Sequence, residues 1–165
     1  MKKYLLVLTV FLMFVASSFS LISAYEVGKE AVNPDKKFDY NVKRLKEKIG
    51  LAFKFSSDKK IDYYQTLLNR RLNELSYITS NKLAANIENA STRYETTAGQ
   101  LTEYMLAKGA SQEQKKEVVS QIEEHQKIVA GLKDGYDATT AEWRFVMNDY
   151  NSLEIYKGKL LNSTP

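Results

Sequence analysis

The fold is decided by residues 61–105, which read IDYYQTLLNRRLNELSYITSNKLAANIENASTRYETTAGQLTEYM. Large apolar residues occupy every eleventh position of this stretch: Ile61, Leu72, Leu83, Tyr94 and Met105. A second series about one turn away has smaller members: Leu68, Thr79, Ala90 and Leu101. Eleven residues make almost three turns of α-helix, so both series lie on one stripe. Because no Pro interrupts the stretch, we predict a single long amphipathic helix whose stripe needs a partner.

The partner is expected in the C-terminal part of the chain. Lys108-Gly109 is typical of a helix end, and Ser111 with Gln114 is typical of a capping box that opens the next helix. Consecutive helices joined by so short a connection are antiparallel, so we expect the chain to fold back at Ala110.

The helix after this turn has its own apolar stripe: Val118, Ile122, Val129, Leu132, Tyr136, Trp143, Met147 and Tyr150. Folding back at Ala110 places Tyr94 near His125, and Leu75 near Trp143. The predicted fold class is therefore all-α: a long antiparallel helical hairpin, coiled-coil-like, with a short N-terminal helix packed at its open end.

Two segments weaken this pattern. Asn89–Gly99 is rich in Ser, Thr and Asn, and Asp134–Thr139 follows a possible helix end at Lys133. We favour kinks in both segments, because the apolar phase continues through them. Breaks in both would instead give a compact four- or five-helix bundle.

The N-terminus has the layout of a secretory signal peptide. Lys2 and Lys3 precede the apolar run Leu5–Val15, and small residues follow as far as Ala24. We predict cleavage after Ala24, with Ser18–Ser20 as a second possible site. The protein is then extracytoplasmic: secreted, periplasmic or on the cell surface. The alternative is a membrane anchor formed by residues 4–24.

The predicted organisation is a signal peptide or uncleaved anchor at 1–24, a flexible leader at 25–37 and a helical domain at 38–165. The first helix is expected from Asp39, acting as N-cap, to about Ala52. Phe53 and Phe55 flank the turn after this helix. We expect them to fill the angle between the first two helices, with a ligand pocket as the alternative.

Composition excludes several classes of function. The chain has 24 basic and 20 acidic residues, and loss of Lys2 and Lys3 would leave a mixed surface with a net charge of +2. Nucleic acid binding needs a concentrated basic surface, so we expect no nucleic acid partner. The chain has no Cys, which excludes disulfides and thiolate sites.

Two charged segments stand out, around Lys43-Arg44 and around Arg70-Arg71. Lys43 with Glu47 and Arg70 with Glu74 have the i, i+4 spacing of intrahelical pairs. Arg70 or Arg71 could also reach Glu47 and stitch the first helix to the second. The functional alternative is recognition of an anionic partner such as a wall polymer or a lipid headgroup. The candidate partner-binding or helix-stitching residues are Lys43, Arg44, Glu47, Arg70, Arg71 and Glu74.

No motif in the sequence indicates catalysis. His125 is the only histidine, and consecutive helical residues point in different directions, so Glu123 and Glu124 cannot join it around one ion. We expect a partly buried structural histidine. Phosphate loops, GxSxG and HExxH are all missing from the sequence. We predict no catalytic residues, no metal and no cofactor.

Residues 38–75 resemble a family of secreted or membrane-attached bacterial and archaeal helical domains of unknown function. The matching positions are Tyr40, Lys43-Arg44-Leu45, Glu47, Phe53-Lys54-Phe55, Lys59-Lys60, Leu68 and Arg70–Leu75. The family usually has Pro where this chain has Asn41 and Ser57. The resemblance implies an extracytoplasmic, all-helical module without catalytic residues.

These observations lead to an expected function: an exported, non-enzymatic helical protein of the cell envelope that acts by binding or as a structural spacer. The alternatives are a holdase-type chaperone for exported chains and an envelope hydrolase. The expected partner is an unknown protein or envelope polymer, and membrane contact is expected only through residues 4–24 if they are not cleaved. An apolar stripe left open would also allow a homo-oligomer.

Overall fold

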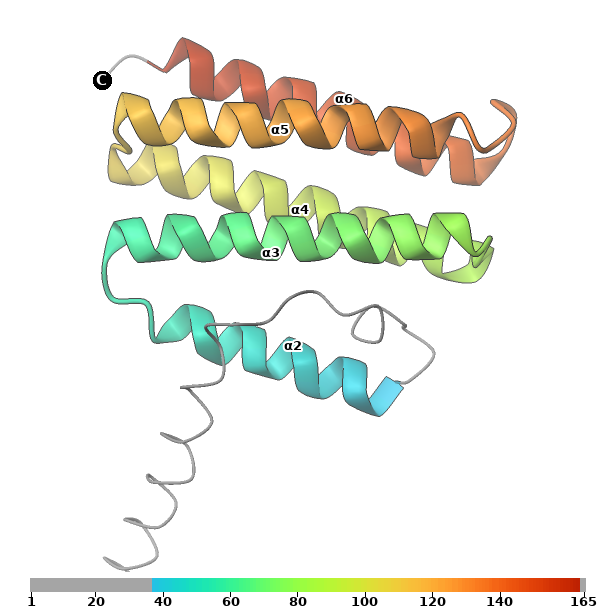
Figure 1. Ribbon diagram of the computed structural model, residues 1–165, viewed down its shortest axis with the longest axis horizontal. Coiled ribbons are helices and arrows are strands. Elements are labelled where there is room, and N and C mark those ends of the chain that lie inside the picture. The colour runs from blue at the N-terminus through green and yellow to red at the C-terminus, as the bar shows by residue number, and fades with distance from the viewer. Residues whose placement is uncertain (1–36, 164–165) are drawn as a thin grey trace, which may run out of the picture. The chain divides into compact units, whose positions relative to one another are not determined.

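The computed structural model describes residues 37–163, which form five helices (Figure 1). The helices are α2 (Lys37–Ala52), α3 (Ser57–Ser80), α4 (Ala84–Lys108), α5 (Gln112–Lys133) and α6 (Ala141–Asn162). This part of the chain contains no strand, so the all-α prediction is confirmed. The predicted signal peptide or anchor, and the leader up to residue 36, lie outside the described residues.

The single long helix predicted over residues 61–105 is wrong, because the chain turns back between α3 and α4. The turn is a Schellman motif: the Leu83 amide donates to the Ile78 carbonyl at 3.0 Å, and the Lys82 amide donates to the Thr79 carbonyl at 3.1 Å. Lys82 has a φ of 54°, a left-handed conformation that usually requires Gly. Because Lys82 takes the place of the usual Gly and no Pro is near, the sequence does not mark this turn.

The loop between α5 and α6 holds this turn in place. Lys82 Nζ donates to the Gly135 carbonyl at 2.6 Å and lies 4.2 Å from the centre of the Tyr136 ring. The hydrogen bond and the cation–π contact help to offset the backbone strain at Lys82. The break between α3 and α4 thus depends on residues more than fifty positions away in the sequence.

The other expected helix boundaries have mixed outcomes. Asn89–Gly99 stays helical inside α4, whereas residues 134–140 do separate α5 from α6. The N-cap of α6 is Thr140, whose side chain accepts from the Trp143 amide at 3.2 Å. The helix end at Gly109, with a φ of 64°, and the capping box at Ser111 are confirmed.

Helices α3 to α6 form two antiparallel hairpins, α3/α4 and α5/α6, which are stacked in the same direction (Figure 1). Asn69 on α3 contacts His125 on α5, and Glu103 on α4 contacts Lys159 on α6, both 56 residues apart. Corresponding helices therefore run parallel. The predicted two-helix hairpin is replaced by a bundle, because the chain breaks once in each half.

The apolar series at every eleventh position correctly identified core residues. Ile61, Leu72, Tyr94 and Met105 are buried, and Leu83 is partly buried against the core. The predicted neighbourhood of Tyr94 and His125 is confirmed by a 3.0 Å contact. The predicted alignment of Leu75 with Trp143 required α3 to run alongside α6, whereas α3 packs mainly on α4 and α5.

Helix α2 packs along α3. It begins at Lys37, so Asp39 lies inside the helix and is not its N-cap as expected. A Cβ at Gly50 would lie 2.5 Å from Tyr63 Oη, so the two helices approach closely only because Gly50 has no side chain. Phe53 and Phe55 are 54% and 88% exposed, so the expectation that they fill the interhelical angle is wrong. Tyr63 occupies that contact instead.

Spin labels at Glu103→Cys and Lys159→Cys test the bundle against the long hairpin. The chain has no native Cys to interfere. In the bundle the two positions lie on adjacent helices, so we expect a distance of about 10–25 Å by double electron–electron resonance. In the long hairpin they would be about 60 Å apart along the helix axis. A distance in that longer range would contradict the bundle.

Candidate functional site

Charged residues from three helices meet in what we call the ion-pair cluster: Lys43 and Glu47 of α2, Arg70, Arg71 and Glu74 of α3, and Arg93 of α4. Glu47 and Arg71 are 5% and 3% exposed and pair with each other. Arg70 Nη1 lies 3.7 Å from Glu47 Oε1. A buried carboxylate is tolerated when cations compensate for its lost hydration. These pairs join α2 to α3.

Glu74 extends the ion-pair cluster to α4. It is completely buried and accepts from Arg71 Nη1 at 3.2 Å, while its other carboxylate oxygen pairs with Arg93 Nη2. Glu74 therefore connects the residue that holds α2 to a residue on α4. Through Arg71, the ion pairs of α2 and of α4 are connected to each other on α3.

The face of α2 that contacts α3 is polar. Burial lowers the pKa of Lys43, although the nearby carboxylates of Glu47 and Glu74 act in the opposite direction. Tyr63 Oη donates to the Glu47 carbonyl at 3.2 Å, and burial raises the pKa of this phenol. Helix α2 therefore docks through hydrogen bonds and ion pairs as well as through the close approach at Gly50.

The structure brings together five of the six candidate residues, all except Arg44. Arg93 was not among the predicted residues, because Glu74 and Arg93 are 19 positions apart. This separation is far from the i, i+3 or i, i+4 spacing that brings side chains together on one helix. The signal becomes visible only once the turn at 81–83 is known, since the two residues lie on opposite sides of it and within one helical turn of the same distance from it. Residues in such positions face each other across an antiparallel hairpin.

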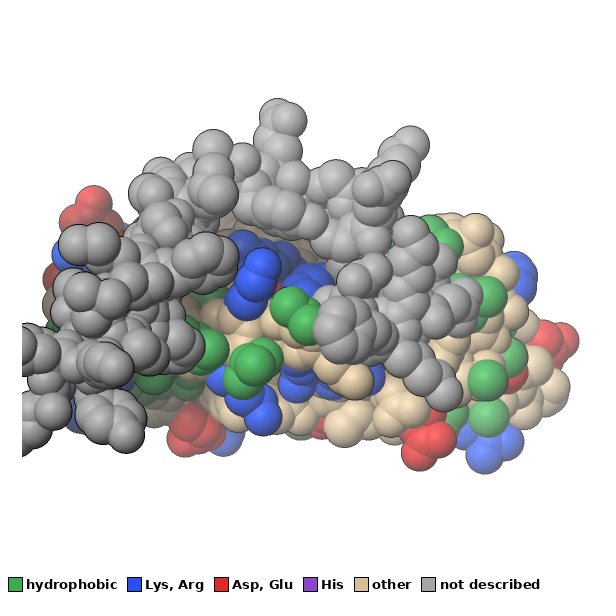
Figure 2. Space-filling model, turned by 90° about the horizontal axis from the view of Figure 1, so that it is seen from below, with side chains coloured by type: hydrophobic (Ala, Val, Ile, Leu, Met, Phe, Trp, Pro, Cys, Tyr) green, Lys and Arg blue, Asp and Glu red, His purple; other side chains and the backbone are tan. Residues whose placement is uncertain are grey.

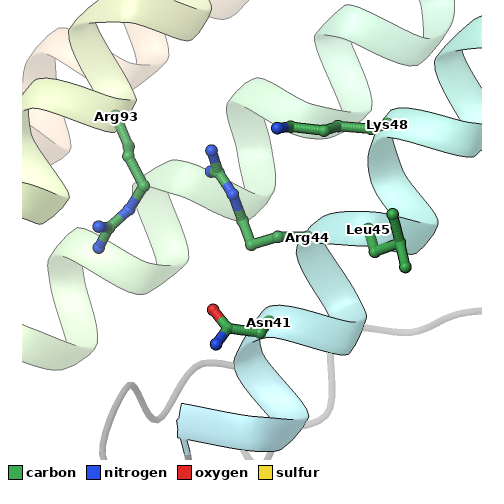
Figure 3. A pocket seen from close by; sticks show the side chains of 5 residues that line it. All are labelled: Asn41, Arg44, Leu45, Lys48 and Arg93. Atoms are coloured by element: carbon green, nitrogen blue, oxygen red, sulfur yellow. The ribbon is translucent and has the colours of Figure 1, made fainter.

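Next to the ion-pair cluster lies a groove of about 370 Å³, which we call the cationic groove. The described residues that line it are Asn41, Arg44, Leu45 and Lys48 of α2 and Arg93 of α4. Figure 3 shows Arg44 and Lys48 extending from α2 toward the side on which Arg93 projects from α4. Basic side chains gather around a hollow on the α2 side in Figure 2. None of the five lining residues is acidic, so the groove favours anions.

A family model covers both of these features. Residues 31–130 match the family described as a domain of unknown function, DUF5667. The chain belongs to this family. The DUF5667 region contains α2, α3, α4 and most of α5, and therefore the whole ion-pair cluster and the whole cationic groove. No curated protein and no solved structure matches the chain.

A buried polar network lies where α3, α4 and α5 of the DUF5667 region meet. His125 Nε2 lies 2.8 Å from Asn69 Oδ1, and Gln121 donates to the same oxygen. Since that oxygen can only accept, His125 Nε2 carries the proton and Nδ1 accepts from Tyr94 Oη. Burial lowers the pKa of His125 to about 4. The imidazole is therefore neutral near pH 7 and links the three helices.

Helix α6 lies beyond the DUF5667 region and adds a buried acid, Asp149. Burial raises the pKa of Asp149 to about 8, although the hydrogen bond from Ser91 acts in the opposite direction. Ser91 Oγ lies 3.0 Å from Asp149 Oδ1 and 3.2 Å from the Phe145 carbonyl. A hydroxyl has one proton for these two oxygens, so both bonds form when protonated Asp149 donates to Ser91.

Within residues 37–163, no group of three or more His, Asp or Glu side chains is placed to hold a metal ion. None of the helices in the same range combines the length and the apolar character needed to cross a membrane.

Glu74→Gln is expected to destabilise the protein by about 3 kcal/mol, because buried Arg71 and partly buried Arg93 each lose their ion pair with this buried carboxylate. The free energy of unfolding in urea measures the effect. Glu88→Gln is the matched control, since Glu88 is an exposed acid on α4 and should change stability by less than about 0.5 kcal/mol. Equal effects of the two substitutions would contradict the stabilising role of Glu74.

Asp149 makes the stability depend on pH between its unfolded pKa of about 4 and its folded pKa of about 8. Its pKa is higher in the folded than in the unfolded chain, so its contribution is full at low pH and is lost as the pH rises toward about 8. We expect the free energy of unfolding to fall by about 2 kcal/mol between pH 6 and pH 8. His125 has the opposite effect, but mainly below its unfolded pKa of about 6.5.

The matched variants are Asp149→Asn, which cannot ionise, and Asp134→Asn, which changes an exposed acid in the α5–α6 loop. The first should abolish the loss of stability between pH 6 and pH 8, and the second should retain it. Urea unfolding at several pH values measures both. A profile for Asp149→Asn like that of the wild type would show that another group is responsible.

Proposed function

We propose that the protein is an exported, non-enzymatic helical protein of the cell envelope, and that its cationic groove binds anionic groups of an envelope polymer. One observation carries the proposal: Arg44, Lys48 and Arg93 line a single surface groove from two helices, and none of the described residues that line it is acidic. Guanidinium and ammonium groups are the side chains that bind phosphate and carboxylate.

The nearby acids support this assignment. Glu47 and Glu74 are buried and are paired with arginines of the ion-pair cluster. Their charges are therefore already compensated, and they do not reach the groove as lining residues. The positive charge of Arg44 and Lys48 remains available at the surface, where an extended anionic chain has access.

The N-terminal sequence supports an extracytoplasmic location for this activity. Lys2 and Lys3, the apolar run Leu5–Val15 and the small residues up to Ala24 are typical of export. A helical bundle of this size would then act outside the cytoplasm by binding a component of the envelope or by spacing two of them.

Arg44→Gln/Lys48→Gln is expected to weaken binding of the full chain to soluble poly(glycerol phosphate) by more than about tenfold. A hydrogen bond to a charged group contributes about 1.5 kcal/mol or more, and two are removed. Isothermal titration calorimetry gives Kd, and the same measurement with poly-L-glutamate distinguishes phosphate from carboxylate recognition. Arg93 is left unchanged because it also holds Glu74.

The control is Lys116→Gln/Lys127→Gln, which removes the same charge from exposed positions on α5. This variant should bind like the wild type if the groove is the site. Equal weakening by both double variants would indicate non-specific attraction to net charge, and no binding by the wild type to either polymer would contradict the proposal.

A further inference from the structure

The orientation of α2 is unusual for a helix that packs on a bundle. Amphipathic helices normally place apolar side chains toward the core and charged side chains toward water. In α2 the buried positions facing α3 include Glu47 and Gly50, and Lys43 is partly buried beside them. Leu45 and Ile49 are instead 58% and 38% exposed. The apolar side of α2 therefore faces away from the bundle.

The exposed apolar residues form a continuous row, which we call the outer stripe: Leu45, Ile49, Phe53 and Phe55. The first three have i, i+4 spacing and follow one side of the helix and its end. The Phe53 and Phe55 rings meet edge to face at 6.3 Å, which extends the stripe beyond the helix. By contrast, the other large exposed apolar residues in the described part of the chain are single positions on α5 and α6: Ile128, Ile155 and Leu161.

Basic residues flank the outer stripe. Lys46 lies on one side of it, Lys48 and Arg44 lie on the other, and Lys54 stands between the two phenylalanines. The only acid between positions 41 and 57 is Glu47, which is buried against Arg71. The exposed charges along this segment are therefore all positive. Figure 2 shows hydrophobic and basic side chains next to one another on the α2 side.

We propose that α2 docks on an anionic lipid bilayer, with the outer stripe in the interface and the flanking cations on the phosphate headgroups. Helices that lie on membranes combine an apolar face of Leu and Phe with Lys and Arg at its edges. Each basic residue close to an anionic surface adds about 1 kcal/mol of attraction, which strengthens binding about fivefold.

The charges and the chain connectivity favour a bilayer over other occupants. Two copies packed stripe to stripe about a twofold axis would bring Lys46 and Lys48 of both copies together. The apolar run Leu5–Val15 has no acid to pair with these cations. Only the residues between positions 24 and 37 separate α2 from the predicted signal or anchor, a span of at most about 45 Å when extended. An uncleaved anchor would therefore keep α2 within reach of the membrane surface.

The test uses the full chain reconstituted with vesicles of equal parts phosphatidylglycerol and phosphatidylcholine, or of phosphatidylcholine alone. A polarity-sensitive NBD label is placed at Leu45→Cys or at Ile155→Cys, whose native side chains are 58% and 59% exposed. We expect a blue shift and quenching by brominated lipid for the label at position 45 on anionic vesicles. The label at position 155 should remain in water.

A second pair of variants tests the stripe itself, in the background of Leu45→Cys. Ile49→Gln/Phe55→Gln should lower the ratio of docked to undocked α2 by about tenfold or more. Ile128→Gln/Leu161→Gln removes exposed apolar residues elsewhere and should have no effect. Circular dichroism confirms that each variant folds.

Three results would overturn the docking. The label at position 45 could stay in water on both kinds of vesicle, or it could enter neutral and anionic vesicles equally. The label could also be shielded from water in the absence of lipid and become exposed again on dilution. That result would assign the outer stripe to a contact with a second copy of the chain. Because the groove test uses soluble polymers without lipid, either proposal can fail while the other stands.

Discussion

The arrangement of the cationic groove and the outer stripe depends on the pairing of Glu47 and Glu74 with Arg71 inside the protein. An ionised carboxylate cannot be buried alone, so these acids require the arginines, and the arginines fix how α2 and α4 meet α3. Because Glu47 must point inward, the opposite side of α2 points outward. The exposed apolar stripe on α2 is therefore a consequence of the inward position of Glu47.

The same pairing makes the two proposals compatible. Arg93 is oriented by Glu74 on one side and lines the cationic groove on the other. Leu45 belongs both to the groove and to the outer stripe, so the two surfaces are continuous along α2. An anionic polymer and an anionic bilayer would meet the same helix on adjacent sides.

The bundle behind α2 gives these surfaces a rigid support. Two hairpins stack in the same direction, and buried polar groups form hydrogen bonds between them. Asn69, Tyr94 and His125 link α3, α4 and α5, and Ser91 with Asp149 links α4 to α6. Buried polar networks of this kind specify a single arrangement, since a slip of one helical turn would leave each group without its partner.

The sequence by itself determined the helical class, the core positions, the caps at Gly109 and Ser111 and the acids and arginines that meet α2, because these depend on local periodicity and spacing. The tertiary structure alone decided where the long apolar pattern breaks. An eleven-residue period continues in phase through a short turn, and Lys82 adopts its left-handed conformation where Gly135 and Tyr136 from a distant loop contact it. Arg93 and the outward face of α2 followed from that break and from the buried pairing of Glu47, and no local pattern contains either.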